Sequence, residues 1–301
     1  MIMNFPDSAA ILQKSLPLPE NMLYPRLTLN CRGRLLSLDQ PVVMGILNVT
    51  PDSFFDGGRY NSADDALRQA ERMLEEGAAI IDIGGMSSRP GSDLIKVEEE
   101  LQRVLPPIEA VTSAFPEVVI SIDTVRSQVA RQAVEAGASI VNDISAAAFD
   151  EAMYPTVAEL AVPYILMHMQ GSPKTMQRHP AYEDVVREVL DFIIEEVGKL
   201  RALDVKDIVI DPGFGFGKTV EHNYQLLKQL HVFGLTELPI LAGLSRKSMI
   251  NKVLKTKAAH ALNGTTALNM VALQQGAKIL RVHDVRPAVE TIKLWQQLNN
   301  T

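Results

Sequence analysis

Eight short apolar runs follow one another along the chain from Pro41 onward, and they constrain the fold more than any other feature. Each run is rich in Val, Ile and Leu without strict alternation of apolar and polar residues, which is typical of parallel strands buried on both faces. A loop and an amphipathic segment follow the runs. We predict an α/β fold, a closed (β/α)₈ TIM barrel, with an open doubly wound sheet as the alternative. The runs span residues 42–48, 79–85, 118–123, 139–144, 163–168, 207–211, 239–245 and 278–284.

One predicted helix shows how the segments between the runs are built. Ser62 can cap its N-terminus, and Asp64 and Asp65 follow in the first turn, where acidic side chains complement the helix dipole. We expect the helix to stop at Gly77, because glycine adopts the left-handed conformation of a helix C-terminus easily. The same Gly-Ala joint precedes two later runs, which indicates a repeated unit.

The domain organisation follows from length and patterning. The 301 residues suit one large domain. Residues 25–38 alternate apolar and polar side chains around Arg32-Gly33, which predicts a β-hairpin that closes the bottom of the barrel. Residues 1–24 carry prolines and weak patterning, so we predict an N-terminal extension over 1–24 and a single barrel over 25–301.

Composition and charge argue against several classes of protein. The net charge of −7 disfavours nucleic acid or an anionic membrane as a partner. Cys31 is the only cysteine, so neither an internal disulfide nor a Cys-rich metal site can form. The N-terminus does not read as a secretory signal, and no stretch approaches the roughly 18 apolar residues of a membrane span. We expect a cytoplasmic protein.

Polar residues gather at the ends of the runs, where a barrel forms its active site. Any one of them could simply cap the next helix or pair with a neighbour, but so many together indicate a shared site. These residues are Asn48, Asp82, Asp123, Asn142, Asp143, His168, Asp211, Ser245, Arg281 and His283.

Two loops, a glycine-rich one and a cationic one, contain residues typical of phosphate or anion binding. Residues 213–219 resemble a phosphate-binding P-loop, but Pro212 stands where that motif needs its first glycine, and Lys218 breaks the dinucleotide-binding pattern. This loop is expected to lie close to a flat ligand. Residues 243–248 place a hydroxyl and two cations before a helix, which favours an anion, with a solvated basic turn as the alternative.

Eight motifs, each at a predicted strand end, resemble those of the dihydropteroate synthase family over about residues 41–290. The motifs are MGILNVTPDSF (44–54), GGMSSRPG (84–91), SIDT (121–124), NDI (142–144), LMHMQGSPKTMQ (166–177), DPGFGFGK (211–218), SRKSMI (245–250) and RVHDV (281–285). The resemblance implies a folate-biosynthesis transferase and sulfonamide target. It would condense (7,8-dihydropterin-6-yl)methyl diphosphate with p-aminobenzoate to 7,8-dihydropteroate and diphosphate.

The resemblance also implies a pterin pocket. The pterin ring presents an amino group and a ring N–H side by side, which one carboxylate can accept together. Asp211 resembles this acceptor, and Lys247 would donate to the ring carbonyl. Met167 and Phe216 would flank the ring, with ordinary core packing as the alternative. The expected pterin contacts are Asp123, Asn142, Met167, Asp211, Phe216 and Lys247.

The same resemblance places the diphosphate at the last strand. Arg281 and His283 share one face of that strand at i and i+2, with a purely structural His283 as the alternative. Asn48 would bind Mg²⁺, an ion that takes few protein oxygens and many phosphate oxygens. Arg89 would add a contact from its loop. We expect Arg281, His283 and Lys247 to be catalytic.

The p-aminobenzoate contacts implied by the family are Phe54, Ser88, Pro90 and Ser245. The arylamine is neutral at physiological pH, so the reaction needs no strong base, and catalysis rests on positioning and electrostatics. The family usually has Glu where this chain has Met86, Thr where it has Ser88, and a small polar residue where it has Phe55. Met86 puts in doubt a polar contact that holds the second loop.

Two rival functions stay open from the sequence. A pterin-dependent methyltransferase barrel shares the pterin pocket but needs no diphosphate clamp. A catalytically impaired pterin-binding paralogue is suggested only by Met86. The family also implies a homodimer, for which the helices around 261–276 and 286–298 are candidates.

Overall fold

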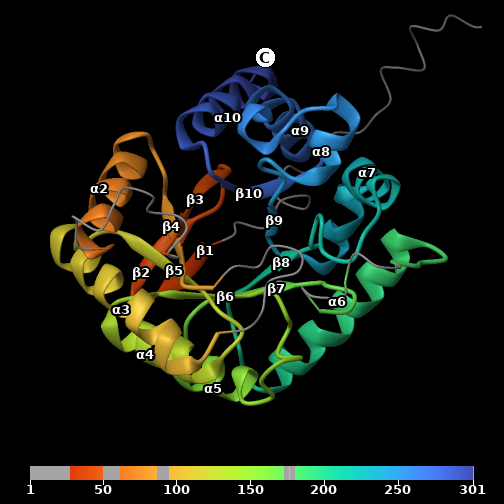
Figure 1. Cartoon of the computed structure of the whole chain (residues 1–301). Helices are drawn as coiled ribbons and strands as arrows, with labels where there is room; N and C mark the ends of the chain where they lie inside the picture. Colours follow the sequence, from red (N-terminus) through yellow and green to blue (C-terminus); the bar gives the residue numbers. More distant parts are fainter. Residues whose placement is uncertain (1–27, 50–61, 87–94, 173–175, 177–179, 301) are drawn as a thin grey trace, which may run out of the picture.

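A computed structural model describes residues 28–49, 62–86, 95–172, 176 and 180–300, and it confirms the closed barrel (Figure 1). Eight parallel strands close in the order β10-β3-β4-β5-β6-β7-β8-β9, so the last strand returns to pair with the first. Seven of the eight predicted apolar runs contain a whole strand, and the eighth overlaps β10, which begins one residue before the run. The strands are β3 Val42–Asn48, β4 Ile80–Gly84, β5 Val119–Asp123, β6 Ile140–Asp143, β7 Tyr164–Met167, β8 Ile208–Asp211, β9 Ile240–Ala242 and β10 Ala277–Val282.

Helices surround the barrel as an outer ring (Figure 1). Their apolar faces pack on the outside of the strands in one large cluster of buried Val, Ile, Leu, Ala and Phe side chains. The α-helices are α2 Ser62–Glu75, α3 Val97–Ala114, α4 Ser127–Ala136, α5 Met153–Leu160, α6 Val185–Ala202, α7 Val220–Lys228, α8 Ser248–Leu254, α9 Leu262–Gln274 and α10 Val285–Asn299. The short 3₁₀ helices are η4 Leu230–Thr236 and η5 Ala258–His260. Among the described residues, no helix is long and apolar enough to cross a membrane.

The lower interior of the barrel is a second apolar layer to which every strand contributes one side chain. Burying each of these side chains contributes about 1.5–3 kcal/mol. Three residues of the N-terminal hairpin region join the layer from below: Leu29, Cys31 and Leu38. The strand residues are Met44, Ile80, Val119, Ile140, Ile165, Val209, Leu241 and Ile279.

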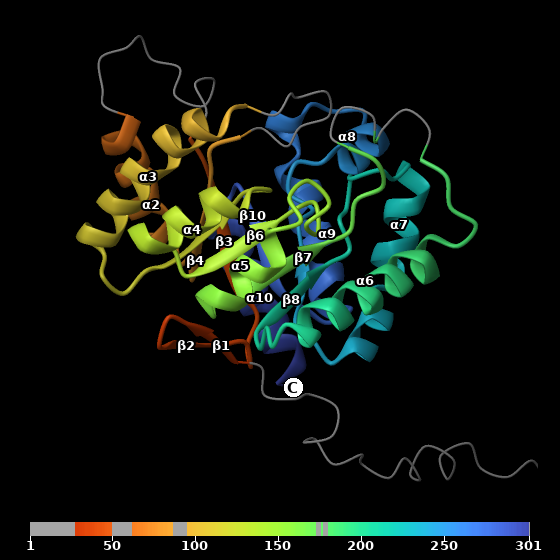
Figure 2. The same cartoon turned by 90° about the horizontal axis from the view of Figure 1, so that it is seen from below.

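The predicted hairpin is present and closes this end. Strands β1 (Thr28–Cys31) and β2 (Arg34–Ser37) pair antiparallel around Arg32-Gly33, on the side of the barrel opposite α8 (Figure 2). Arg32 Nη1 donates to Val134 O at 2.8 Å, which ties the turn to the end of α4. The hairpin therefore seals the bottom and leaves the opposite rim for chemistry.

The Gly-Ala joint has a clear structural reason. α2 ends at Glu75, and Gly77 then adopts a φ of +100°. Gly77 N donates to Leu74 O at 3.0 Å and Ala78 N donates to Met73 O at 2.9 Å, the pair of bonds that closes a Schellman motif. The same two bonds close α4 before β6. The joint turns each of these helices directly into the next buried strand.

Candidate active site

The carboxyl ends of the strands bring predicted site residues together at one rim. Asn48 ends β3, Asp123 ends β5 and Asp211 ends β8. A methyl group placed on Gly84 would lie 3.6 Å from Asp123 Oδ2 and 3.8 Å from Asn48 Oδ1. The side chains of Asn48 and Asp123 therefore face the same point, although 74 residues separate them in the chain.

Arg281 is the centre of a buried ion-pair cluster at this rim. Its Nε donates to Asp82 Oδ2 at 2.7 Å, and its Nη2 donates to Asp123 Oδ2 at 2.6 Å. Asn142 Nδ2 donates to the same Asp82 Oδ2 at 3.2 Å. The Asp82 side chain is 0% exposed and holds two predicted substrate contacts in place. The sequence marks Asp82 as a polar residue near a strand end but predicts no site role for it, because the residue with which it pairs, Arg281, lies on the last strand.

The cluster holds two carboxylates against one guanidinium. Burial raises the pKa of Asp123 to about 7, Arg281 opposes this, and the neighbouring charge of Asp82 adds to it. Asp123 therefore sits near the point where it gains or loses a proton at neutral pH. Asp123 can therefore gain or lose a proton when a charged ligand binds beside it.

Asp211 and Lys247 form the opposite side of the rim. A methyl group placed on Gly243 would lie 3.6 Å from Lys247 Nζ and 3.9 Å from Asp211 Oδ2, so both groups face one point. Lys247 Nζ also donates to Phe214 O and lies 4.8 Å from the centre of the Phe216 ring. Burial lowers the pKa of Lys247 to about 8, and Asp211 opposes the shift. The pair offers a donor and an acceptor side by side, as an amide-like ring edge requires.

A small apolar cluster lies among these polar groups. Met167 and Phe216, the predicted faces of the pterin site, are 2% and 8% exposed and belong to it. Met86 joins the same cluster, so the residue that departs from the family pattern is a buried apolar contact. The polar tie at the base of its loop comes from Arg103 Nη1, which donates to Gly85 O at 2.9 Å. The cluster consists of Met86, Val125, Ile144, Met167, Met176 and Phe216.

Ser245 and His283 contact each other at the rim. Ser245 Oγ lies 3.0 Å from His283 Nδ1, and His283 N donates to Ser245 Oγ at 3.2 Å. Desolvation and the charge of Arg281 lower the pKa of His283, so the exposed edge of this ring is that of a neutral imidazole at pH 7. The contact fixes the orientation of the ring. It joins a predicted p-aminobenzoate contact to a predicted diphosphate contact.

The remaining predicted residues fall into two groups. Phe54, Phe55, Ser88, Arg89 and Pro90 lie outside the described residues, so their roles stay predictions. Among the tip residues, the Asp143 carboxylate accepts bonds from its own turn and from Tyr164, which makes it a support of β6 and its loop. His168 Nδ1 lies 2.9 Å from the Nζ of Lys218, a residue for which the sequence predicted no role in the site.

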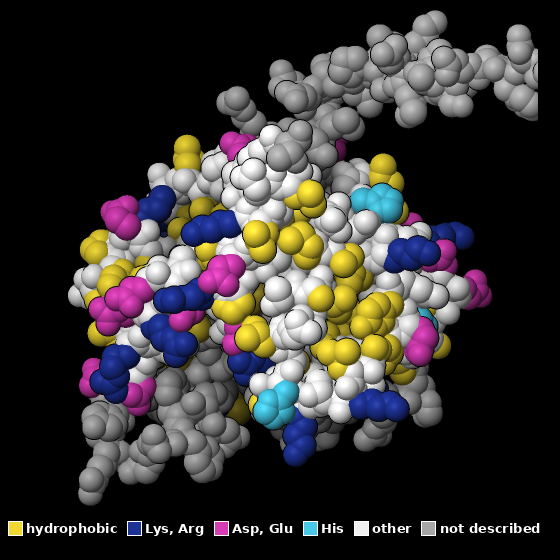
Figure 3. Space-filling model, turned by 90° about the horizontal axis from the view of Figure 1, so that it is seen from above, with side chains coloured by type: hydrophobic (Ala, Val, Ile, Leu, Met, Phe, Trp, Pro, Cys, Tyr) yellow, Lys and Arg dark blue, Asp and Glu magenta, His cyan; other side chains and the backbone are white. Residues whose placement is uncertain are grey.

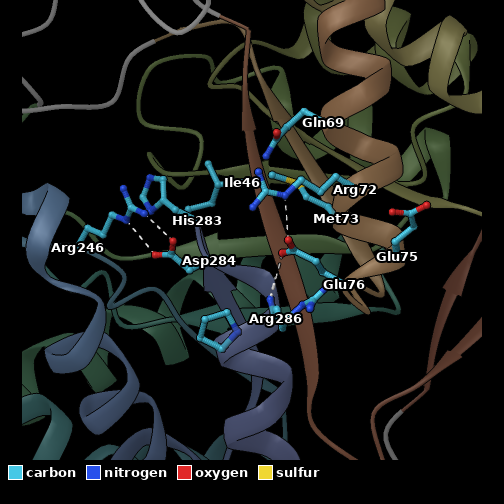
Figure 4. A pocket seen from close by; sticks show the side chains of 11 residues that line it. Ile46, Gln69, Arg72, Met73, Glu75, Glu76, Arg246, His283, Asp284 and Arg286 are labelled. Carbon is cyan, nitrogen blue, oxygen red and sulfur yellow. Dashed lines mark hydrogen bonds and ion pairs between the residues drawn. The ribbon is translucent and has the colours of Figure 1, made fainter.

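A separate hollow of about 760 Å³ lies beside the rim between α2 and α10 (Figure 4). Its charges are largely paired: Arg72 Nε lies 2.9 Å from Glu76 Oε1, and Arg246 Nε donates to Asp284 Oδ2 at 2.9 Å. Among the predicted site residues that the structure describes, only His283 lines it. The hollow is therefore a neighbour of the rim site. Figure 3 shows the side of the molecule on which α8, α9 and α10 lie in Figure 1, where apolar side chains gather across the middle of the face and charged side chains lie mostly toward its edges.

Comparison with known proteins gives this architecture a family. Residues 44–283 match the family described as pterin binding enzyme. Dihydropteroate synthase of Escherichia coli K12 is 48% identical over 265 residues, which cover 87% of this chain and 93% of that protein. The Haemophilus influenzae dihydropteroate synthase is 47% identical over 274 residues, 90% of this chain and 99% of that one.

Solved structures agree with these relatives. The Xanthomonas albilineans dihydropteroate synthase with 4-aminobenzoic acid superposes with a TM-score of 0.87 at 42% identity, covering 92% of this chain and 99% of that one. The Yersinia pestis dihydropteroate synthase in a sulfonamide complex gives 0.86 at 42% identity, covering 91% and 100%. The chain belongs to the pterin-binding enzymes and, within them, to the dihydropteroate synthase family.

Proposed function

We propose that this chain catalyses the dihydropteroate synthase reaction, joining (7,8-dihydropterin-6-yl)methyl diphosphate to p-aminobenzoate. The observation that carries the proposal is the shared rim: the Asp211–Lys247 pair and the Arg281 cluster both lie at the carboxyl ends of the strands, where the charge of Arg281 acts on the pKa of both Asp211 and Lys247. An apolar cluster with Met167 and Phe216 lies at the same strand ends. One structural neighbour is described with 4-aminobenzoic acid and another with 7,8-dihydropteroate, one substrate and the product of this reaction.

The pterin binds between Asp211 and the Arg281 cluster. The Asp211 carboxylate accepts the amino group and the neighbouring ring N–H, and Lys247 donates to the ring carbonyl. Asn142 and Asp123 meet the remaining polar edge. Met167 and Phe216 cover the faces of the ring, where apolar side chains exclude water.

The diphosphate leaves at the Arg281 end of the site. Arg281, His283 and the loop residue Arg89 hold its oxygens, and preorganised donors of this kind lower such barriers by about 3–4 kcal/mol each. Asn48 supplies an amide oxygen next to Asp123, a hard oxygen set that fits Mg²⁺ bound mainly through phosphate. When bound there, Mg²⁺ would neutralise charge on the leaving group. Among the described residues no group of three or more His, Cys, Asp or Glu side chains could hold a metal ion.

The bond changes are simple. The carbon–oxygen bond to the diphosphate breaks, and the pterin ring stabilises the cation left on its methylene carbon. The arylamine nitrogen then donates its lone pair to that carbon, and its surplus proton passes to water or to the diphosphate. Ser245 and the loop residues Phe54, Ser88 and Pro90 position p-aminobenzoate for this attack. Positioning and charge compensation carry the catalysis.

The rival functions receive no support from a specific contact. A methyltransferase barrel would not need Arg281 and His283 at the end of β10. Met86, the feature that suggests an impaired paralogue, is a buried apolar contact in the cluster of Met167 and Phe216. We infer a homodimer through the surfaces of α9 and α10, where Leu262, Leu294 and Leu298 are exposed. A cytoplasmic location is part of the same proposal.

Product formation from the pterin diphosphate, labelled p-aminobenzoate and Mg²⁺ tests the function. Wild-type enzyme should form labelled dihydropteroate and release one diphosphate per product. Asp211→Ala and Lys247→Ala should each weaken pterin binding at least about tenfold, because each removes charge-assisted hydrogen bonds. Pterin binding without turnover by the wild type would support the impaired paralogue instead.

A further inference from the structure

A buried lysine behind Asp211 has no part in the reaction as described. Lys218 lies in the loop between β8 and α7 and is 2% exposed. Its Nζ lies 2.9 Å from His168 Nδ1 and donates to Gly213 O and Phe216 O, each at 3.0 Å. These acceptors are all uncharged, so within the described part of the chain Lys218 forms no direct ion pair. Burying a cation without a paired anion costs free energy, so a role for Lys218 toward a charged group nearby is expected.

His168 is built to accept this lysine. Burial and the charge of Lys218 lower the pKa of His168 to about 2, so its ring is neutral and Nδ1 can accept from the ammonium. The ring packs edge-on against Phe192 with centroids 4.9 Å apart. His168 N donates to Asp211 O at 3.1 Å. The Lys218–His168 contact therefore bridges the end of β7 to the loop that follows β8.

The bridged loop carries the pterin contacts. Gly213 N donates to Asp211 Oδ1 at 2.7 Å, while the Gly213 carbonyl accepts from Lys218. Gly213 has a φ of +72°, and a methyl group placed on it would lie 1.9 Å from His168 O. The next carbonyl that Lys218 binds belongs to Phe216, whose ring is in the apolar cluster. Moving the lysine would therefore disturb the acceptor and the ring wall together.

The charge of Lys218 acts on the same carboxylate. Burial raises the pKa of Asp211, and Lys247, the Gly213 N–H, Arg281 and Lys218 oppose the rise. Burial lowers the pKa of Lys218 to about 7, Asp211 opposes this and Lys247 adds to it. Lys218 is therefore a cation below about pH 7 and loses its charge as the pH rises above that value. His168, the titratable group that Lys218 contacts directly, is neutral there.

We propose that Lys218, held by His168, is a positioning residue of the pterin site that fixes the loop beside Asp211 and keeps Asp211 an anionic acceptor. The inference rests on the proposed function, because it assigns Lys218 to the reading of the pterin ring. Ionised Asp211 accepts two pterin donors, whereas a protonated carboxyl accepts poorly. Affinity is therefore lost as pH falls through the pKa of Asp211, and losing the Lys218 charge moves that loss to higher pH.

Calorimetric titration with 6-hydroxymethyl-7,8-dihydropterin between pH 5 and pH 8.5 tests the proposal, with steady-state kinetics alongside. Lys218→Met should weaken pterin binding about tenfold near pH 6, because Asp211 then accepts the two pterin donors less well without the charge of Lys218. The effect should be smaller at pH 8, where Lys218 has largely lost its charge in the wild type. The acid midpoint of binding should move to higher pH, while the KM for p-aminobenzoate stays the same. Lys228→Met, an exposed lysine at the end of α7, is the matched control.

Lys218→Gln separates the effect of Lys218 on the loop from the effect of its charge on Asp211. It also provides the test if Lys218→Met does not fold. Glutamine keeps two N–H donors for the carbonyls but carries no charge, so it should still move the acid midpoint. An unchanged midpoint in a folded variant, or an equal loss of affinity at every pH, would overturn the proposal. A wild-type enzyme that fails to bind pterin would refute the proposed function instead, whatever the variants do.

Discussion

Arg281→Met should destabilise the protein in a way that depends on pH. The substitution keeps most of the side-chain volume but leaves Asp82 and Asp123 facing each other without a cation. In the wild type the three side chains are 16%, 0% and 11% exposed, so little solvent can compensate. Removing one partner from a buried ion pair costs about 3–5 kcal/mol, and we expect the lower part of that range at pH 7 because Asp123 can take up a proton.

The pH dependence follows from Asp123. When folding raises the pKa of a carboxyl, the folded protein loses stability as the pH rises from the pKa of the group in the unfolded state to its pKa in the folded state. In the wild type that loss ends near pH 7, where the pKa of Asp123 lies. Without Arg281 the pKa rises further, so the loss continues. The difference in unfolding free energy should therefore grow above pH 7 by up to about 1.4 kcal/mol per pH unit.

Urea unfolding followed by circular dichroism at pH 6.5 and pH 8.5 measures both effects. Arg131→Met is the control, because Arg131 pairs with Glu159 where the side chains are 41% and 64% exposed. Such a surface pair contributes about 0–1 kcal/mol, with little change between these pH values. A loss below about 1 kcal/mol for Arg281→Met at both pH values would refute the account of a buried charge cluster.

Three further changes test the fold around the site. Gly213→Ala should prevent folding, because its methyl group would overlap His168 O. In Gly276→Ala the methyl group meets open space, so the free energy of unfolding should fall by only about 1–2 kcal/mol because of the positive φ. Equal far-UV circular dichroism for the two variants would contradict this. Met86→Ala should lower the free energy of unfolding by about 2 kcal/mol and also weaken pterin binding, since it opens the apolar cluster. Asp184→Ala should cost about 1 kcal/mol in urea unfolding and leave turnover unchanged, because Asp184 Oδ1 only caps α6.

The barrel could be predicted because its cause is local. Each apolar run must be buried on both faces, and the Gly-Ala joints mark where helices turn into strands. Even the strand-end polar residues follow from this, because parallel strands bring their carboxyl ends to one rim. The hairpin around Arg32-Gly33 was equally visible, since its alternating pattern needs only neighbouring residues.

The pairings within the rim could not be predicted in the same way. Asp82 and Arg281 lie 199 residues apart, and their contact depends on the closure of the barrel between β10 and β3. Lys218 and His168 both stood out in the sequence, one inside a glycine-rich loop and one at a strand end. Nothing local shows that one buried side chain donates to the other. Such contacts depend on side-chain direction, which apolar patterning does not determine.

The lower layer of the barrel lets stability and chemistry be changed separately. Its side chains come one from each strand, and the hairpin covers them with Leu29, Cys31 and Leu38. Exchanges among Val, Ile, Leu and Met that conserve volume are tolerated well in such a layer. A more heat-resistant enzyme could therefore be engineered from this end, by repacking the plug beneath the strands while every substrate contact at the far end stays untouched.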